Sequence, residues 1–454
     1  MKKNALYSFL LALSVLVSLL VMPAAAADPP ELQCRNAILM DLKHDEVLYE
    51  KKAHDKAYPA SLTKVMTALL TLEAVDAGQI TLSTPVTADY SAMDGLDQWS
   101  SSAGIKPGMT LTVEELLYCL LLPSANEAAN MLAVTLDGSI SGFVDHMNRR
   151  ASELGCQGTH FANPHGLHDD NHYTTAYDVA LMMKAAMEHD LFRTIIHTKD
   201  HRIPATDTHP EFYFFNTNGL ISNLHYSGYV YDKCIGGKTG TTEEAGKCLV
   251  AAAERGEDTL ISVVLGSSVI TDADGKEKQG NFTESTKLLE WGFRNFKRVT
   301  ITKDAEPVDK VAVTLSSEAD EVMVKPSGSI TRTMPVDVDL DQIESEIHLF
   351  SPTVEAPVKE GQVLGTMKLS YQGEVYGTLD LVAVNSVARS ELLYKKAQFF
   401  NFFQSVWGKL LLIAVVVLVL APTFYFLVIR KKRRVRAPSR RSGYRGSRYR
   451  GGRR

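Results

Sequence analysis

The sequence predicts an α+β protein with an antiparallel sheet flanked by helices, then a small all-β domain and a C-terminal transmembrane helix. Residues 65–72 form an apolar run of helical character, and the runs at 247–252 and 260–266 are typical of paired antiparallel strands. Beyond residue 299 short β-rich pieces alternate with turns, and residues 410–429 are uncharged and mostly apolar. A length of 454 residues leaves room for two or three domains.

The chain begins with the pattern of a secretory signal peptide, which we assign to residues 1–27. Two lysines follow the first methionine, residues 6–21 are apolar, and four alanines at 24–27 offer a small-residue cleavage site. The mature protein is therefore expected to begin near residue 28 and to lie outside the cytoplasm.

Several helices and a hairpin are predicted in the part that follows. Residues 34–50 alternate loosely, as in a β-hairpin, and the helix after them is expected to end at Gly78. Thr112 and Glu115 have the spacing of a capping box that opens a second helix. Further helices are expected at 125–136, 178–187 and 283–296.

Ser61 and Lys64 lie at the start of the first helix. Residues three apart on a helix are neighbours, so the lysine amine can face the serine hydroxyl. A serine hydroxyl becomes a good nucleophile when a base takes its proton, and a neutral amine can be that base. The alternative is structural, with Ser61 capping the helix and Lys64 as a solvated side chain.

Ser124 and Asn126 form a second candidate element, on a tight connection between two helices after Pro123. The hydroxyl of Ser124 and the side-chain amide of Asn126 are polar groups that could belong to the same active site as Ser61 and Lys64. Ser124 with Glu127 also fits a capping box, which would make the hydroxyl purely structural.

The third element is the Lys-Thr-Gly at Lys238, Thr239 and Gly240, which precedes the antiparallel pair of strands. On an edge strand it would present an ammonium, a hydroxyl and a closely approachable backbone, which suit a substrate carboxylate. A phosphate-binding loop is not indicated, because the pattern Gly-x-x-x-x-Gly-Lys-Ser/Thr is absent.

Three histidines and two aspartates lie at 163–173, a composition that raises the question of a metal site. The glycine and proline of the segment predict a structured loop rather than the helix that a His-x-x-x-His ligand pair requires. The five cysteines show no Cys-x-x-Cys spacing. We therefore expect no metal ion and no cofactor.

The C-terminal part changes character. Residues 298–389 predict a β-rich domain that acts as a spacer or docking module, and 390–409 mix aromatic residues with lysines, as in a helix at a membrane interface. Residues 410–429 are long enough to span a bilayer. The tail at 430–454 holds 13 Lys and Arg and no acid, which predicts a cytoplasmic tail and an extracytoplasmic body at 28–407.

The charge distribution limits the classes of binding partner to be expected. The net charge of −5 combines the basic tail with a body at 28–407 that holds 32 basic and 53 acidic residues. An acidic body argues against nucleic acid as a partner of the catalytic part. The tail at 430–454 is expected to contact anionic lipids, with RNA binding as the alternative.

The three elements occur in a fixed order, with Ser124 63 positions after Ser61 and Lys238 114 positions after Ser124. This set resembles the low-molecular-weight penicillin-binding proteins, the serine-type D-Ala-D-Ala carboxypeptidases of bacterial cell walls. The resemblance covers almost all of residues 30–390. It implies a β-lactamase/DD-peptidase-like catalytic domain at 28–297 and the β domain of the same family after it.

The resemblance also implies roles for individual residues. Ser61 would attack the carbonyl between the last two D-alanines of a peptidoglycan stem peptide, with Lys64 as its base. Ser124 would relay the proton to the leaving amine, and Asn126 would hold Lys64 and the substrate amide. A β-lactam inhibitor would acylate the same serine.

The resemblance places the substrate carboxylate on Lys238 and Thr239, with Gly240 on the same strand. The backbone amides of Ser61 and Thr241 would form the oxyanion hole.

Two positions depart from the family pattern. Gly237 stands where relatives usually have a bulky aliphatic residue, so a different packing of that strand is expected. Asn281 stands where relatives often carry arginine, which leaves Lys276 or Lys278 as the extra cation for the substrate carboxylate.

Other functions are compatible with parts of this pattern. A class A β-lactamase shares the same three elements but resembles a Glu-x-x-x-Asn pattern between the second and the third, and this chain lacks that pattern. The alternatives are a DD-endopeptidase or transpeptidase, which differ in the acyl acceptor, and a non-catalytic penicillin-binding scaffold of the cell wall.

Overall fold

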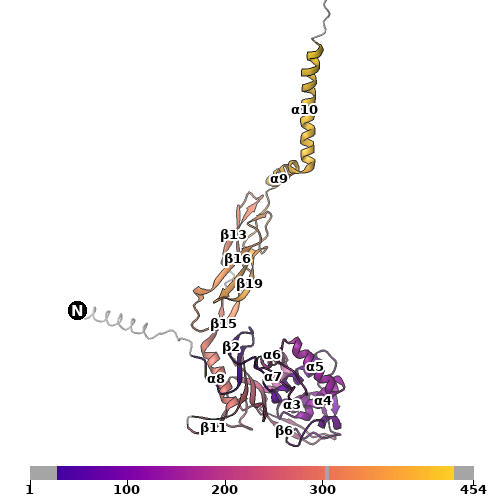
Figure 1. Ribbon diagram of the computed structural model, residues 1–454, viewed down its shortest axis with the longest axis vertical. Coiled ribbons are helices and arrows are strands. Elements are labelled where there is room, and N and C mark those ends of the chain that lie inside the picture. The colour runs from indigo at the N-terminus through magenta and orange to yellow at the C-terminus, as the bar shows by residue number, and fades with distance from the viewer. Residues whose placement is uncertain (1–27, 273, 302–305, 434–454) are drawn as a thin grey trace, which may run out of the picture. The chain divides into compact units, whose positions relative to one another are not determined.

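The structure is a computed structural model that describes residues 28–272, 274–301 and 306–433 (Figure 1). The predicted signal peptide and the tail from residue 434 lie outside the described residues. The chain divides into two compact units, Met1–Ile301 with Thr331–Asp341 and Thr302–Ile330 with Gln342–Arg454.

The first unit is built on a five-stranded antiparallel sheet with the strand order β2-β1-β9-β8-β7. Its strands are β1 (Asn36–Asp41), β2 (Val47–Lys51), β7 (Cys234–Thr242), β8 (Gly246–Arg255) and β9 (Asp258–Ser267). The predicted hairpin and the predicted antiparallel pair are confirmed. The strand that carries the Lys-Thr-Gly, β7, is an edge strand, as expected.

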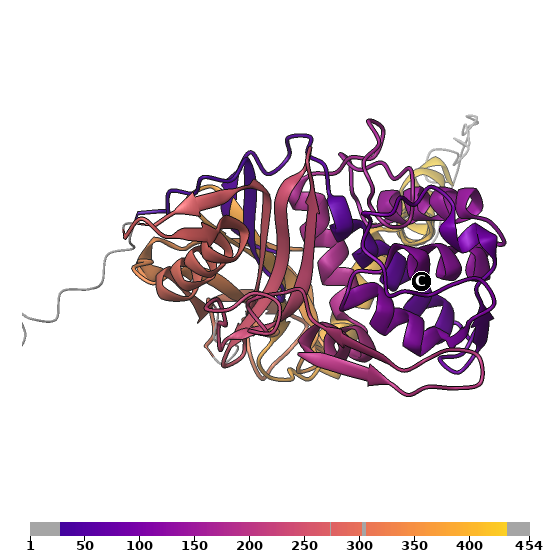
Figure 2. The ribbon, with the colours of Figure 1, turned by 90° about the horizontal axis from the view of Figure 1, so that it is seen from below.

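Helices cover both faces of this sheet (Figure 2). The helix α8 (Gly280–Asn295) packs on one face, and α6 (Ala176–Met187) and α7 (Asp190–His197) pack on the other. The helices α2 (Lys64–Asp76), α3 (Val113–Leu121), α4 (Asn126–Asp137) and α5 (Ile140–Glu153) complete the helical part of the unit. Successive side chains of a strand point to opposite faces. In β1, Leu39 packs with Leu288 and Leu289 of α8, whereas Ile38 and Met40 belong to the core formed by the other helices.

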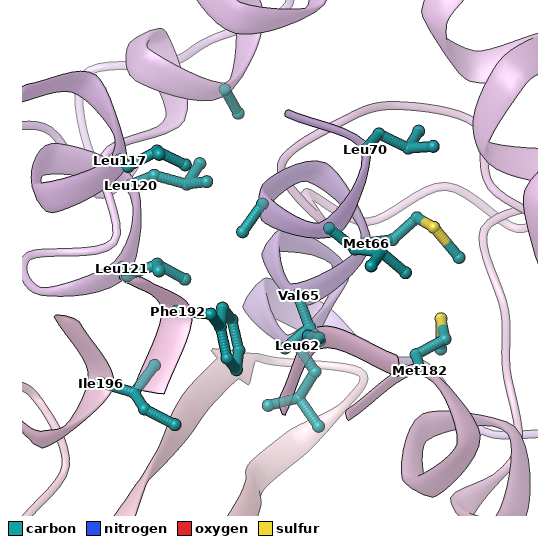
Figure 3. Packing of buried hydrophobic residues seen from close by; sticks show 14 of the residues in the cluster. Leu62, Val65, Met66, Leu70, Leu117, Leu120, Leu121, Met182, Phe192 and Ile196 are labelled. Carbon is teal, nitrogen blue, oxygen red and sulfur yellow. The ribbon is translucent and has the colours of Figure 1, made fainter. Parts of the chain in front are cut away.

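The helix that follows Ser61, α2, lies inside the helical core. Its residues Val65, Met66 and Leu70 pack between Leu117 of α3 on one side and Met182 of α6 on the other (Figure 3). A helix that is apolar on all sides is typical of a buried position. Packing on every side fixes the helix that carries the candidate lysine.

Short elements complete the first unit. They are the paired strands β3 (Pro85–Thr87) and β4 (Thr110–Thr112), β5 (Asp200–Ile203) and β6 (Phe212–Phe215), β10 (Val269–Thr271) and β11 (Glu277–Gln279), and β12 (Phe296–Thr300) and β15 (Thr331–Pro335), with the short helix η2 (Tyr90–Met93). The short helix η3 (Leu340–Gln342) spans the point in the chain where the first unit ends and the second resumes. Because β15 pairs with β12, it belongs with the first unit although it lies within the predicted β domain at 298–389.

The second unit contains a six-stranded sheet with the order β16-β18-β19-β14-β13-β17, in which only the β13–β17 pair is parallel. Its strands are β13 (Asp309–Thr314), β14 (Glu321–Pro326), β16 (Glu344–Leu349), β17 (Thr353–Glu355), β18 (Val363–Tyr371) and β19 (Glu374–Ala383). The expected β-rich character is confirmed.

Two helices follow, α9 (Glu391–Gln404) and α10 (Val406–Arg433). Over the described residues α10 is the one helix long and apolar enough to cross a membrane, at Val406–Val428, and it contains Pro422. Residues 406–409, assigned from the sequence to the interfacial helix, are part of α10. This helix is a candidate membrane anchor.

All five cysteines lie in the first unit as buried free thiols. Burial raises the pKa of the Cys34, Cys156 and Cys234 thiols to about 12 and that of Cys248 to about 11. The Cys119 pKa is also raised by burial.

Candidate active site

Ser61 lies in a 3₁₀ turn, η1 (Ala60–Thr63), that leads into α2 at Lys64. In a 3₁₀ turn side chains three residues apart are eclipsed. The two are accordingly neighbours, with Lys64 Nζ 3.2 Å from Ser61 Oγ. Neither helix start has a side-chain cap, and Lys64 is fully buried, so the structural alternative is wrong for both residues.

The Lys64 amine has three oxygen neighbours. Besides Ser61 Oγ, Nζ lies 2.6 Å from Asn126 Oδ1 and 2.7 Å from the His165 carbonyl. Burial lowers the pKa of Lys64 well below its ordinary value, and the nearby Lys238 charge lowers it further, while Glu127 acts in the opposite direction. These surroundings favour a neutral amine next to the serine hydroxyl.

The polar segment around residue 165 supports the turn that carries Ser61. Thr67 Oγ1 donates to the Pro164 carbonyl at 2.6 Å, which fixes the segment to α2. Gly166 has a φ of +92°, and a Cβ there would lie 1.9 Å from the Ala60 carbonyl oxygen. Only glycine allows this close approach. Burial lowers the pKa of His165 to about 3, so this ring is neutral.

His172 has a similar structural role. Its Nδ1 accepts a hydrogen bond from the Ala162 amide at 3.0 Å, and its Nε2 lies 2.7 Å from Thr63 Oγ1. Burial lowers its pKa to about 4. Over the described ranges no three His, Cys, Asp or Glu side chains come together in a way that could hold a metal ion.

Ser124 lies in the connection before α4 with a positive φ of 68°. Its side chain is buried, and within the described chain its Oγ has no hydrogen-bond partner. The capping alternative is wrong, because α4 has Ala125 at its N-cap without a side-chain bond. The carboxylate of Glu127 instead accepts from Ser102 Oγ and the Ala103 amide, each at 2.7 Å.

The Lys-Thr-Gly strand passes directly beside the serine turn. A Cβ at Gly240 would lie 3.0 Å from both the Pro59 carbonyl and the Ser61 amide nitrogen. Lys238 is buried, its Nζ donates to the Thr239 carbonyl at 2.9 Å, and burial lowers its pKa to about 7.

Two glycines precede Lys238 in β7, directly after a bulge in this strand. The pairing with β8 shifts between Cys234 and Gly236, and Gly236 and Gly237 have φ values of 145° and 157°. A Cβ at Gly237 would lie 2.2 Å from the Val250 carbonyl oxygen. A side chain at this position would therefore clash with the backbone of β8.

Two family models match the chain, the D-alanyl-D-alanine carboxypeptidase model at residues 23–269 and the penicillin-binding protein 5 C-terminal domain model at residues 296–389. The chain belongs to the D-alanyl-D-alanine carboxypeptidase family. The predicted membership, the fold class and the assignment as a serine-type hydrolase are confirmed.

Individual relatives agree with this assignment. The D-alanyl-D-alanine carboxypeptidase DacF of Bacillus subtilis is 33% identical over 377 residues, which is 83% of this chain and 90% of the relative. Penicillin binding protein 5 of Haemophilus influenzae has a TM-score of 0.62 at 27% identity, over 80% of this chain and all of the other. The Streptomyces K15 DD-transpeptidase has a TM-score of 0.52 at 31% identity, over 59% of this chain and all of the other.

This member of the carboxypeptidase family has a pocket of about 180 Å³ at the serine turn. Of the predicted residues, Ser61, Ser124, Thr239, Gly240 and Thr241 line it. Three others (Lys64, Asn126 and Lys238) are buried. The remaining residues of the pocket wall are Ser101, Thr217, His225, Tyr226, Lys247, Gln279, Asn281 and Phe282.

Most of this wall was not predicted from the sequence. Thr217 is one example, with its Oγ1 2.7 Å from Thr239 Oγ1. Lys276 and Lys278, the expected extra cations, do not line the pocket, whereas Lys247 does. The alternation of β8 places Lys247 on the same face as Leu249, but only the register with β7 places it beside Thr241.

Proposed function

We propose that this carboxypeptidase-family protein removes the terminal D-alanine from peptidoglycan stem pentapeptides through an acyl-enzyme on Ser61. The observation that carries the proposal is the buried amine of Lys64, 3.2 Å from Ser61 Oγ and with a lowered pKa. A neutral amine at this distance is the base that the serine requires.

The contacts of Lys64 explain how it can accept a proton. A neutral amine has two N–H donors and one lone pair. Asn126 Oδ1 and the His165 carbonyl are acceptors, at 2.6 and 2.7 Å, and can use both donors. The lone pair is then left for the Ser61 proton. As Oγ attacks the carbonyl carbon of the penultimate D-alanine, its proton passes to Nζ.

The next step breaks the bond to the terminal D-alanine. The negative oxygen of the tetrahedral intermediate is stabilised by the backbone amides of Ser61 and Thr241. Ser124, whose Oγ has no partner within the described chain, passes the proton held by Lys64 to the leaving nitrogen. The C–N bond then breaks, free D-alanine leaves, and the shortened stem stays as an ester on Ser61.

Water completes the reaction. Lys64, neutral again, takes a proton from a water molecule whose oxygen attacks the ester carbonyl. The ester bond breaks, Ser61 regains its proton and the shortened stem is released. A β-lactam follows the first steps only, because its opened ring remains attached to the enzyme and no leaving group departs.

Transpeptidation is the second candidate function, favoured by the likeness to the Streptomyces K15 DD-transpeptidase over that protein's whole chain. The acyl-enzyme on Ser61 is common to both reactions. In a transpeptidase, an amine of a neighbouring stem attacks the acyl-enzyme in place of water. In an endopeptidase, the neighbouring stem is the leaving amine in place of terminal D-alanine.

The domain assignment and membrane topology form part of the proposal. Residues 1–27 direct export, 28–297 are the catalytic domain and 298–389 the β domain. The apolar helix α10 anchors the chain with the catalytic domain outside the cytoplasm. The basic tail at 430–454 lies in the cytoplasm and contacts anionic lipids.

The test uses the full-length protein in detergent with a fluorescent penicillin and then with a stem pentapeptide. We expect a covalent label that Ser61→Ala abolishes, and release of D-alanine without an added amine. A label with D-alanine release only when an acceptor amine is added would favour the transpeptidase. Absence of both label and release would refute the enzyme function and favour a scaffold.

A further inference from the structure

Among the residues that the structure describes, Lys247 is the one lysine or arginine that lines the active-site pocket. The lysine of the Lys-Thr-Gly, Lys238, lies behind the wall, with its ammonium bonded to the Thr239 carbonyl. Asn281, at the start of α8, offers only a neutral amide to the pocket. Among the described residues that line the pocket, Lys247 is therefore the lysine or arginine that can meet a bound carboxylate with a full positive charge.

The strand register puts Lys247 beside the threonines of β7. Lys247 is paired directly with Thr241, and Leu249 with Thr239. Residues directly opposite each other in an antiparallel pair share a face, with Cβ atoms about 5 Å apart. Leu249 packs with Phe282 of α8, so Thr239, Thr241 and Lys247 lie on the face that α8 covers.

The ammonium of Lys247 is available for a ligand. It is part-buried, and within the described chain it makes no hydrogen bond and no ion pair. The other lysines of this region differ, since Lys276 is exposed and Lys278 lies 6.0 Å from the ring centroid of Tyr229. Neither reaches the pocket wall.

We propose that Lys247 is the cation that binds the C-terminal carboxylate of the stem peptide, together with the Thr239 and Thr241 side of β7. The proposal rests on the proposed function. The same ammonium binds the carboxylate of a penicillin. Lys247 thereby makes the site specific for a chain that ends at the leaving D-alanine, because an uncharged or extended terminus lacks this ion pair.

The test compares ligands with and without a free carboxylate, on full-length protein in detergent. Lys247→Met is assayed with diacetyl-L-Lys-D-Ala-D-Ala and with the same peptide ending in a carboxamide. Loss of a charge-assisted hydrogen bond should lower kcat/KM for the free acid about tenfold to a hundredfold and change that for the amide less than about threefold. Lys247→Arg should keep most of the activity on the acid.

Lys278→Met is the matched control and should leave both values unchanged, and thermal melting of all variants checks their folding. An equal loss for acid and amide, or no loss for either, would overturn the proposal. Equal results would mean that Lys247 only supports the strand or has no part in binding.

Benzylpenicillin and its methyl ester separate this inference from the proposed function. If the wild-type protein is acylated but releases no D-alanine, the proposed function fails, and the acid-to-ester ratio of acylation rates still decides the role of Lys247. A ratio that falls about tenfold or more in Lys247→Met supports the inference, and an unchanged ratio refutes it. If the wild-type protein reacts with neither peptide nor penicillin, both proposals fail.

Discussion

Replacement of Lys238 by methionine should make the protein more stable while it damages the site. Burial lowers the Lys238 pKa from 10.5 to about 7. In the unfolded chain the amine keeps its ordinary pKa, so folding must remove a proton or bury a charge. The difference of roughly 3.5 pKa units corresponds to about 5 kcal/mol of destabilisation below pH 7.

The net effect of Lys238→Met is smaller than this value. The lysine also donates a hydrogen bond to the Thr239 carbonyl, whose loss offsets about 1 kcal/mol or more. We expect Lys238→Met to gain about 3 kcal/mol at pH 6, equivalent to a rise in melting temperature on the order of 5–10 °C for a domain of this size.

The pH dependence identifies the cause. A lowered pKa destabilises the fold fully below the folded pKa of about 7, and this penalty is relieved as the pH rises from there towards 10.5. The difference in melting temperature between Lys238→Met and wild type should therefore shrink to less than half between pH 6 and 9.5.

The assay is thermal melting of the full-length protein in detergent across this pH range, with Lys276→Met as the exposed-lysine control. A variant that melts below wild type at pH 6, or a difference that stays constant with pH, would refute the reasoning.

Three further outcomes are expected. Lys64→Arg should slow acylation by fluorescent penicillin about a thousandfold or more, because a guanidinium stays protonated and cannot take the serine proton; a wild-type rate would exclude Lys64 as the base. The acylation rate should rise with pH as Lys64 loses its proton, with a midpoint well below 10.5. Lys238→Met should move this midpoint to higher pH, because removing a positive charge raises the pKa of Lys64. A midpoint that stays in place or moves to lower pH would contradict the effect of the Lys238 charge on Lys64. Gly166→Ala should lose at least about 2 kcal/mol and slow acylation, whereas Gly155→Ala, with a φ of +83° and no atom within 4 Å of the new Cβ, should lose about 1 kcal/mol and keep its acylation rate. Equal effects of the two substitutions, compared by melting and labelling, would argue against the contact between Gly166 and the serine turn.

The sequence was sufficient to predict the fold class and the side chains that meet at the serine turn. Ser61 and Lys64 come from one part of the chain and Asn126 from another, yet each belongs to a short pattern with a chemical reason. The capping box at Thr112 and the glycine after α2 were predicted for the same reason, because side chains and glycine leave local signals.

The unpredicted parts depend on backbone groups and on contacts between distant segments. The third acceptor of Lys64 is the His165 carbonyl, which any residue could supply, so no side-chain pattern indicates it. Lys247 could not be assigned to the pocket without the register between β7 and β8. Of the helices, α5 and α7 were missed, and α5 combines a polar surface with only three buried residues, Phe143, Met147 and Ala151.

The buried thiols have a consequence for how this protein matures. A thiol exchanges with disulfides through its thiolate and needs access to the attacking partner. In the folded chain neither condition is met, because each cysteine is buried and, in the case of Cys34, the thiol pKa is raised to about 12. With the proposed export into an oxidising compartment, the thiols stay reduced only if folding is faster than oxidation. The protein should mature without disulfide catalysts and should keep all five thiols unmodified for as long as the first unit stays folded.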